Sequence, residues 1–221
     1  MQDNANKRFG FYVSGNATRL VKTIELYPEI VASTFIVVND ESPNTNLAQL
    51  LADKKVEYIE FNYKEKELKG NGKNIFISNL LLQKFQEYQI DYAFCFGGRI
   101  LKGDLLSLYK NKIINFHPAI LPMFPGIKSI DQATNSNSFL LGNTAHFVDE
   151  GMDTGPVIMQ STLHSKYFTA YEDVLGLQLP MIKQIFLWLT QNRLTVEGRN
   201  VTIKNADYSN VSFYPKIEIN L

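Results

Sequence analysis

The chain has 221 residues, of which 45% are hydrophobic and 20% are charged, and this composition predicts one main hydrophobic core. Twenty-two basic residues balance 22 acidic ones, so the chain lacks the broad positive charge typical of nucleic-acid binding. No apolar run reaches the roughly 18 residues of a membrane-spanning helix, and we therefore expect neither a nucleic-acid partner nor a membrane partner.

Strands and helices alternate through the first half of the chain. Runs of β-branched and aromatic residues predict strands, and apolar residues at helical spacing predict helices between them. The predicted strands cover residues 9–13, 35–38, 56–61, 92–96 and 113–114, and the helices lie around 20–27, 47–51, 75–88 and 105–109. This alternation predicts a Rossmann-like, doubly wound α/β fold whose mostly parallel sheet has helices on both faces.

The loop after the first predicted strand contains the small residues Ser14, Gly15 and Asn16. A loop of this kind, placed before a helix, exposes backbone N–H groups that suit an anion. The alternative, an ordinary turn and helix cap, stays open. A second charged and glycine-containing stretch, residues 64–73, follows no strand in the required way, and we predict a solvated loop there.

The last third of the chain contains one long apolar stripe. Residues 174–192 are predicted to form an amphipathic helix that is kinked at Pro180. Residues 196–203 are predicted to form a small hairpin, and residues 211–221 a strand-like tail with Pro215 at a sheet edge.

The composition of the first nine residues and the cysteine content indicate the cellular compartment. The first nine residues suit neither a signal peptide nor a membrane anchor. The single cysteine, Cys95, excludes an intrachain disulfide and indicates a reducing compartment. We therefore expect a cytoplasmic protein.

The residues most suited to chemistry lie between 113 and 160. Asn115 and His117 are two positions apart on an extended segment, so both side chains point to one side. The prolines that follow predict a structured functional loop. Asp153 lies in a turn bounded by glycine and proline, from which it can reach the same place. Each residue alone has a common structural use, as a turn, core or cap residue, whereas their convergence predicts a site.

Asn115-Phe116-His117-Pro118-Ala119-Ile120-Leu121-Pro122, followed by Asp153-Thr154-Gly155-Pro156, resembles the signature of the formyltransferases that use 10-formyltetrahydrofolate. The likeness extends more weakly from about Gly10 to about Asn205. It is nearest to the small phosphoribosylglycinamide formyltransferases and to their relatives that formylate amino sugars. It implies a catalytic domain over residues 1–205, with residues 206–221 as an extended tail.

The resemblance also implies roles for individual residues. It implies that Asn115, His117 and Asp153 are catalytic and that no metal is needed. It implies that the folate co-substrate is bound by Arg99, Ile100, Leu101, Asp149 and Glu150. It implies further that Ser14, Gly15 and Asn16 bind the acceptor. His146 and His164 could join His117 as metal ligands only with irregular spacing, so we expect no metal site.

The acceptor is expected to be a small molecule with a primary amine. A methionyl-tRNA formyltransferase would need a further RNA-binding domain and a basic face. Family members that act on glycinamide ribonucleotide usually carry a Glu-His pair where this chain has Leu175–Leu179, and a glycine where it has Ala17. We therefore favour a nucleotide-linked amino sugar of bacterial surface polysaccharides such as the O-antigen of lipopolysaccharide, with glycinamide ribonucleotide as the alternative.

Two further questions stay open at this point. A non-catalytic folate- or nucleotide-binding module is the alternative from a different functional class, although such a module has no physical need for Asn115, His117 and Asp153 together. A second copy of the chain, forming a homodimer, stays open as a partner.

Overall fold

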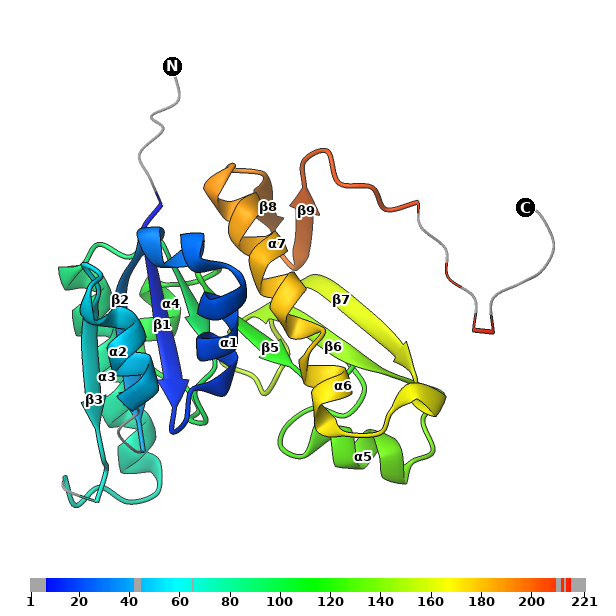
Figure 1. The fold of residues 1–221 in the computed structure, drawn as a ribbon, viewed down its shortest axis with the longest axis horizontal. Coiled ribbons are helices and arrows are strands. Elements are labelled where there is room, and N and C mark those ends of the chain that lie inside the picture. Colours follow the sequence, from blue (N-terminus) through cyan, green and yellow to red (C-terminus); the bar gives the residue numbers. More distant parts are fainter. Residues whose placement is uncertain (1–6, 42–44, 65, 210–211, 213, 216–221) are drawn as a thin grey trace.

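A seven-stranded sheet forms the centre of the protein (Figure 1). The computed structural model describes residues 7–41, 45–64, 66–209, 212 and 214–215. The strand order is β3-β2-β1-β4-β5-β6-β7, and β8 and β9 pair in a separate small sheet. The strands are β1 (Phe9–Ser14), β2 (Thr34–Asp40), β3 (Glu57–Phe61), β4 (Tyr92–Cys95), β5 (Ile113–His117), β6 (Leu140–Phe147), β7 (Val157–His164), β8 (Leu194–Glu197) and β9 (Asn200–Ile203).

Helices cover both faces of the large sheet. Buried side chains of α1, α2 and α7 pack in one apolar cluster, and those of α3 and α4 pack in a second. Neighbouring residues of β1, such as Phe11 and Tyr12, belong to different clusters, because successive side chains of a strand point to opposite faces. The helices are α1 (Thr18–Leu26), η1 (Pro28–Ser33), α2 (Thr45–Ala52), α3 (Asn71–Glu87), α4 (Asp104–Leu108), α5 (Ser129–Asn135), η2 (Ser165–Tyr167), α6 (Tyr171–Leu175) and α7 (Gln178–Thr190).

The sheet reverses its winding direction between β1 and β4. β1 pairs in parallel with β2 on one side and with β4 on the other, and β5 continues the parallel set. Parallel α/β sheets bind ligands at the carboxyl ends of the strands where such a reversal occurs. At this edge the backbone N–H of Gly98, just after β4, donates to the Ser14 hydroxyl at the end of β1, over 2.8 Å. The predicted doubly wound fold is confirmed.

β6 and β7 extend the sheet in the antiparallel sense, and β6 was not predicted from sequence. Its residues include Gly142, Asn143, Thr144 and His146, so its sequence lacks the apolar pattern that predicts a strand. All residues of β6 from Leu141 onward are nevertheless buried, because β5 and β7 flank it. The predicted catalytic loop is also corrected, since Asn115 and His117 belong to β5 itself.

The C-terminal third differs from prediction at one helix. Residues 174–192 form two helices, α6 and α7, which are separated at Gly176 and Leu177. Pro180 lies in the first turn of α7, where a missing N–H costs nothing, so it does not kink the helix. The hairpin of β8 and β9 is confirmed, whereas most of the predicted strand at 211–221 lies outside the described residues.

The predicted loop at 64–73 is shorter than expected, because α3 already begins at Asn71. Within the ranges that the structure describes, no helix is long and apolar enough to cross a lipid bilayer.

Candidate functional site

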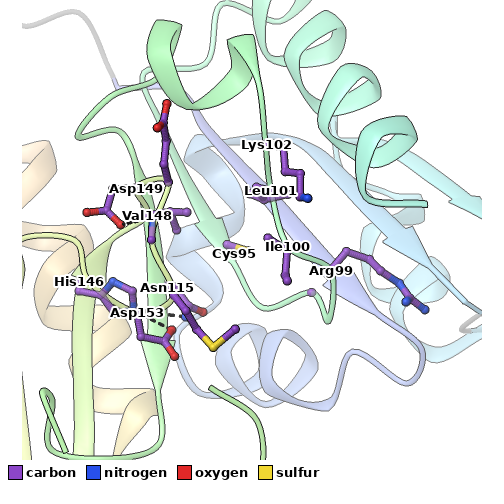
Figure 2. Close-up of a pocket in the computed structure, with 14 residues that line it drawn as sticks. Cys95, Arg99, Ile100, Leu101, Lys102, Asn115, His146, Val148, Asp149 and Asp153 are labelled. Atoms are coloured by element: carbon purple, nitrogen blue, oxygen red, sulfur yellow. Dashed lines mark hydrogen bonds and ion pairs between the residues drawn. The ribbon is translucent and has the colours of Figure 1, made fainter. Parts of the chain in front are cut away.

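A cavity of about 320 Å³ opens at the carboxyl ends of β4 and β5 (Figure 2). Its volume is in the range of clefts that bind small molecules. The structure brings together here seven of the residues that were predicted to be catalytic or to bind the folate. These are Asn115, Asp153, Arg99, Ile100, Leu101, Asp149 and Glu150, and the remainder of the wall includes Cys95, Gly97, Lys102, His146, Val148, Gly151 and Met152.

Asn115 faces His146 across the pair of strands β5 and β6. The two residues are register partners, and the Asn115 Nδ2 atom lies 3.4 Å from His146 Nε2. The other ring nitrogen, His146 Nδ1, is 2.9 Å from the Phe147 carbonyl and donates to it. His146 Nε2 is then an acceptor in the neutral ring, so it receives one N–H of the Asn115 amide. That amide carries a second N–H, which can donate to a ligand.

Asp153 joins the two histidines. Its Oδ2 atom lies 3.2 Å from His117 Nδ1, and its Oδ1 atom lies 3.6 Å from His146 Nε2. The opposite nitrogen of His117, Nε2, is 2.7 Å from the Phe124 carbonyl oxygen. Both nitrogens of the buried His117 ring therefore face oxygen acceptors.

The turn that carries Asp153 is held against the end of β6. A Cβ atom on Gly155 would lie 1.7 Å from the Phe147 carbonyl oxygen, so only glycine allows this approach. The Phe147 N–H donates to the Pro156 carbonyl over 2.9 Å. On the other side of the site, the Gly126 N–H donates to Asp153 Oδ2 over 2.7 Å. The Asp-x-Gly-Pro sequence thus fixes the carboxylate beside the histidines.

The surroundings of Asp153 act on its pKa in opposite directions. Burial, the largest single influence, raises the pKa of the carboxyl group. The Gly126 N–H and the two neighbouring histidines lower it, and together they prevail. The pKa of Asp153 is therefore lower than its ordinary value, and the carboxylate is ionised at neutral pH.

This lowered pKa predicts a pH-dependent contribution to stability. A group whose pKa falls on folding stabilises the protein above its unfolded pKa of about 3.9, and the contribution is lost as the pH falls through the folded value. We therefore expect the free energy of unfolding of the Asp153→Asn variant to fall less steeply than that of the wild type between about pH 5 and pH 3. Urea unfolding at several pH values measures this difference, and parallel curves would contradict it.

The residues expected to bind the folate lie on two sides of the cavity. The Arg99 side chain points away from Asp153, pairs with Glu41 and lies over the Tyr63 ring at 5.3 Å (Figure 2). Leu101 is buried in the core, whereas Ile100 is 56% exposed. The Asp149 carboxylate accepts from Thr154 and from the Gly151 N–H. Any contact of Arg99 and Leu101 with a ligand in the cavity is therefore expected to use their backbone.

The Ser14–Asn16 loop lies at the neighbouring strand end and not in the cavity wall. The Ser14 hydroxyl donates to the buried Asp40 carboxylate and accepts from Gly98, so it holds two strand ends together. Ala17 takes a left-handed conformation with φ of 46°, which keeps the turn that glycine would adopt more easily. As the N-cap of α1, Ala17 supplies no side-chain cap, which leaves the first turn of α1 to its backbone N–H groups.

The segment Leu175–Leu179 links α6 to α7 and offers no carboxylate. Its polar residue, Gln178, is fully buried and turned inward. The Gln178 amide donates to Asn143 Oδ1 over 2.7 Å and to the Phe116 carbonyl over 3.3 Å. Gln178 therefore ties α7 to β5, next to His117.

The remaining candidate residues of the sequence are Cys95, His164 and His146. Burial raises the pKa of the Cys95 thiol to about 12, so it is not poised as a nucleophile. His164 lies at the far end of β7, where its ring packs on Phe139. His146, which the sequence suggested only as an improbable metal ligand, lies inside the site. Its place in the site follows from its pairing with Asn115 on the neighbouring strand, and not from a sequence motif.

Comparisons with known proteins show the family of the chain. The family model described as formyl transferase matches residues 7–172. The phosphoribosylglycinamide formyltransferase of Bacillus subtilis is 33% identical over 160 residues, which are 71% of this chain and 79% of that protein. The formyltetrahydrofolate deformylase of Haemophilus influenzae is 37% identical over 86 residues, which are 38% of this chain but only 31% of the deformylase.

A solved structure extends the likeness to nearly the whole chain. The glycinamide ribonucleotide transformylase 1 of Symbiobacterium toebii superposes with a TM-score of 0.77 at 25% identity, over 92% of this chain and 96% of the other. One conclusion follows from the shared fold, the matched family model and the relative from Bacillus subtilis. The chain belongs to the formyl transferase family, the enzymes that use 10-formyltetrahydrofolate as formyl donor.

Proposed function

We propose that this enzyme transfers the formyl group of 10-formyltetrahydrofolate to the primary amine of glycinamide ribonucleotide. The observation that carries the proposal is the cluster of Asn115, His146 and Asp153 in the cavity wall, with His117 in contact with Asp153. Such a cluster provides N–H donors and an ionised carboxylate within one small, partly buried space. Those are the groups that transfer of an acyl group to an amine requires.

The residues have separate tasks in this reaction. The amine nitrogen bonds to the formyl carbon, the bond from that carbon to the folate nitrogen breaks, and one amine proton is returned to the folate. Negative charge collects on the formyl oxygen as the amine attacks. Asn115 donates an N–H group to that oxygen, and His117 donates one through Nε2 in exchange for its contact with the Phe124 carbonyl oxygen. Asp153 stays ionised, holds His117 in its donating form and supplies a carboxylate toward which the amine proton moves.

The cavity suits the folate in size and in chemistry. Its wall combines the apolar residues Ile100, Val148 and Met152 with polar residues such as Asn115 and Asp149. A flat heteroaromatic ring with several hydrogen-bonding edges fits such a mixed wall. When bound, the folate supplies the formyl group on a nitrogen that can leave.

The choice of acceptor changes from our first expectation. Two similar proteins, the relative from Bacillus subtilis and the solved structure from Symbiobacterium toebii, are named for glycinamide ribonucleotide as acceptor. Their names support the alternative acceptor over the nucleotide-linked amino sugar. Ala17 keeps the left-handed turn of the first loop, which removes one of the two objections to the ribonucleotide. The other objection concerns Leu175–Leu179, so a ribose held there would have to be held without a carboxylate.

The acceptor is tested by comparing amines at saturating 10-formyltetrahydrofolate. We expect kcat/KM for glycinamide ribonucleotide to exceed that for amino-sugar nucleotides at least about tenfold, a difference of roughly 1.4 kcal/mol in activation free energy. Folate absorbance and the mass of the formylated product are both measured. A higher kcat/KM for an amino-sugar nucleotide would overturn the choice. Release of formate without any amine would instead indicate a deformylase.

A further inference from the structure

The hairpin of β8 and β9 touches the turn that carries Asp153. Arg199 lies at the tip of this hairpin, and its guanidinium donates through Nη2 to the carbonyl oxygen of Thr154, the residue after Asp153. Arg199 also lines a surface cavity of about 650 Å³ together with residues 148–151 and Pro156, which lie before and after the same turn. The tip of the hairpin therefore lies against this segment.

The body of the hairpin is fixed, so its tip can hold another segment. Ile203 at the end of β9 is buried in the apolar cluster that also contains residues of α1 and α7, and Val196 and Val201 pack against that cluster. Gly198 and Arg199 form the two-residue turn between the paired strands, and Gly198 has the positive φ, 61°, that such a turn requires. The Arg199 side chain therefore starts from a fixed backbone.

The turn that carries Asp153 has a conformation that benefits from support. Asp153 takes a φ of 55°, in the left-handed region that residues with a Cβ atom adopt less readily than glycine. The Thr154 hydroxyl donates to the Asp149 carboxylate over 2.7 Å, and a Cβ atom on Gly151 would lie 2.0 Å from that hydroxyl oxygen. Thr154 thus joins the turn to the wall of the cavity, and Arg199 holds the carbonyl group of this same residue.

We propose that Arg199 is a positioning residue, which holds the Thr154 carbonyl and thereby keeps the Asp153 carboxylate in contact with its two histidines. Those contacts are 3.2 Å to His117 Nδ1 and 3.6 Å to His146 Nε2. A displacement of about 1 Å costs a catalytic group up to about a hundredfold in rate. The hairpin lies beyond residue 172, where the match to the family model ends, so this contact adds to the family signature. The inference rests on the proposed function only in giving Asp153 a role in turnover.

The kinetic test compares the two ends of one hairpin. Arg193, at its base, donates to the Lys204 carbonyl over 2.7 Å, so Arg193→Ala is a matched control that removes an arginine from the hairpin away from Thr154. We expect Arg199→Ala to lower kcat at least about fivefold, with KM for glycinamide ribonucleotide changed less than about twofold. Arg199→Lys is expected to keep kcat within about threefold of the wild type, because an ammonium can donate to a single carbonyl oxygen. Arg193→Ala is expected to keep kcat within about twofold.

A double variant shows whether Arg199 acts through Asp153. In the Asp153→Asn background, Arg199→Ala is expected to change kcat less than about twofold, since the carboxylate that Arg199 positions is already gone. If Asp153→Asn is itself slow, any of three results would overturn the proposal. These are a wild-type kcat in Arg199→Ala, an equal loss of kcat in both backgrounds, and the same loss of kcat in Arg193→Ala.

A spectroscopic measurement requires neither turnover nor an acceptor. The chain has three histidines, so the ring signals of His117 and His146 can be followed by NMR, with His164 at the far end of β7 as an internal reference. We expect Arg199→Ala to shift the ring signals of both site histidines at constant pH and to leave that of His164 in place. Arg193→Ala is expected to shift none of the three.

The two measurements separate failure of the inference from failure of the proposed function. If Asp153→Asn keeps the wild-type kcat, the role given to Asp153 in turnover fails, and the ring signals alone decide whether Arg199 holds the turn. Unchanged ring signals of both site histidines in Arg199→Ala would reject the inference, whichever amine the enzyme formylates.

Discussion

Asn115→Ala is expected to lower kcat at least about a hundredfold, because it removes an N–H donor from the oxygen that gains negative charge in the reaction. The Asn115 side chain is only partly buried and its one neighbour of note is His146, at 3.4 Å, so the change leaves no large cavity. Steady-state rates at saturating folate and acceptor measure the effect. The loss is expected in kcat and kcat/KM alike, since the donor acts on the transition state.

His117→Ala provides the companion measurement. It is also expected to lower kcat at least about a hundredfold, for the same reason. His117 is only 4% exposed and ties Asp153 to the Phe124 carbonyl, so this change is expected to reduce stability as well, unlike Asn115→Ala. Thermal unfolding of both variants separates the two effects. Because both residues act on one oxygen, the double variant is expected to lose less than the product of the single losses. Wild-type turnover by Asn115→Ala would contradict the assignment.

Asp153→Asn is expected to lower kcat at least about a hundredfold with almost no change in side-chain volume. The amide carries no charge, so His117 loses the carboxylate that it contacts, and the amine proton loses the nearby carboxylate. The same change is expected to alter the shape of the pH–rate profile. Rates measured from about pH 5 to pH 9 test both points together.

Asp149→Asn is the matched control for this variant. Asp149 lines the same cavity, but its carboxylate accepts from Thr154 and Gly151 and does not reach the histidines. We expect its kcat to stay within about tenfold of the wild type, with any change appearing in KM for the folate. An Asp153→Asn enzyme with the wild-type pH–rate profile would assign the proton transfer to another group.

Local patterns in the sequence were sufficient for much of the fold. The run of apolar and aromatic residues at 9–13 predicts a buried strand because β1 is covered on both faces, and the amphipathic stripe at 174–192 predicts helix because its apolar face needs a core. These signals are short in range. They fail at β6, whose polar residues are buried by strands distant in sequence, and at Pro180, whose effect depends on where the helix begins.

The sequence by itself determined the family, the alternation of strands and helices, and the candidate residues Asn115, His117 and Asp153. It did so because those residues lie in short motifs with fixed spacing. Only the tertiary structure decided that His146 joins them and that the Gln178 side chain turns inward. Each of these depends on strand register or on packing between segments far apart in the chain. Such contacts leave no local pattern, because they exist only when the whole sheet has formed.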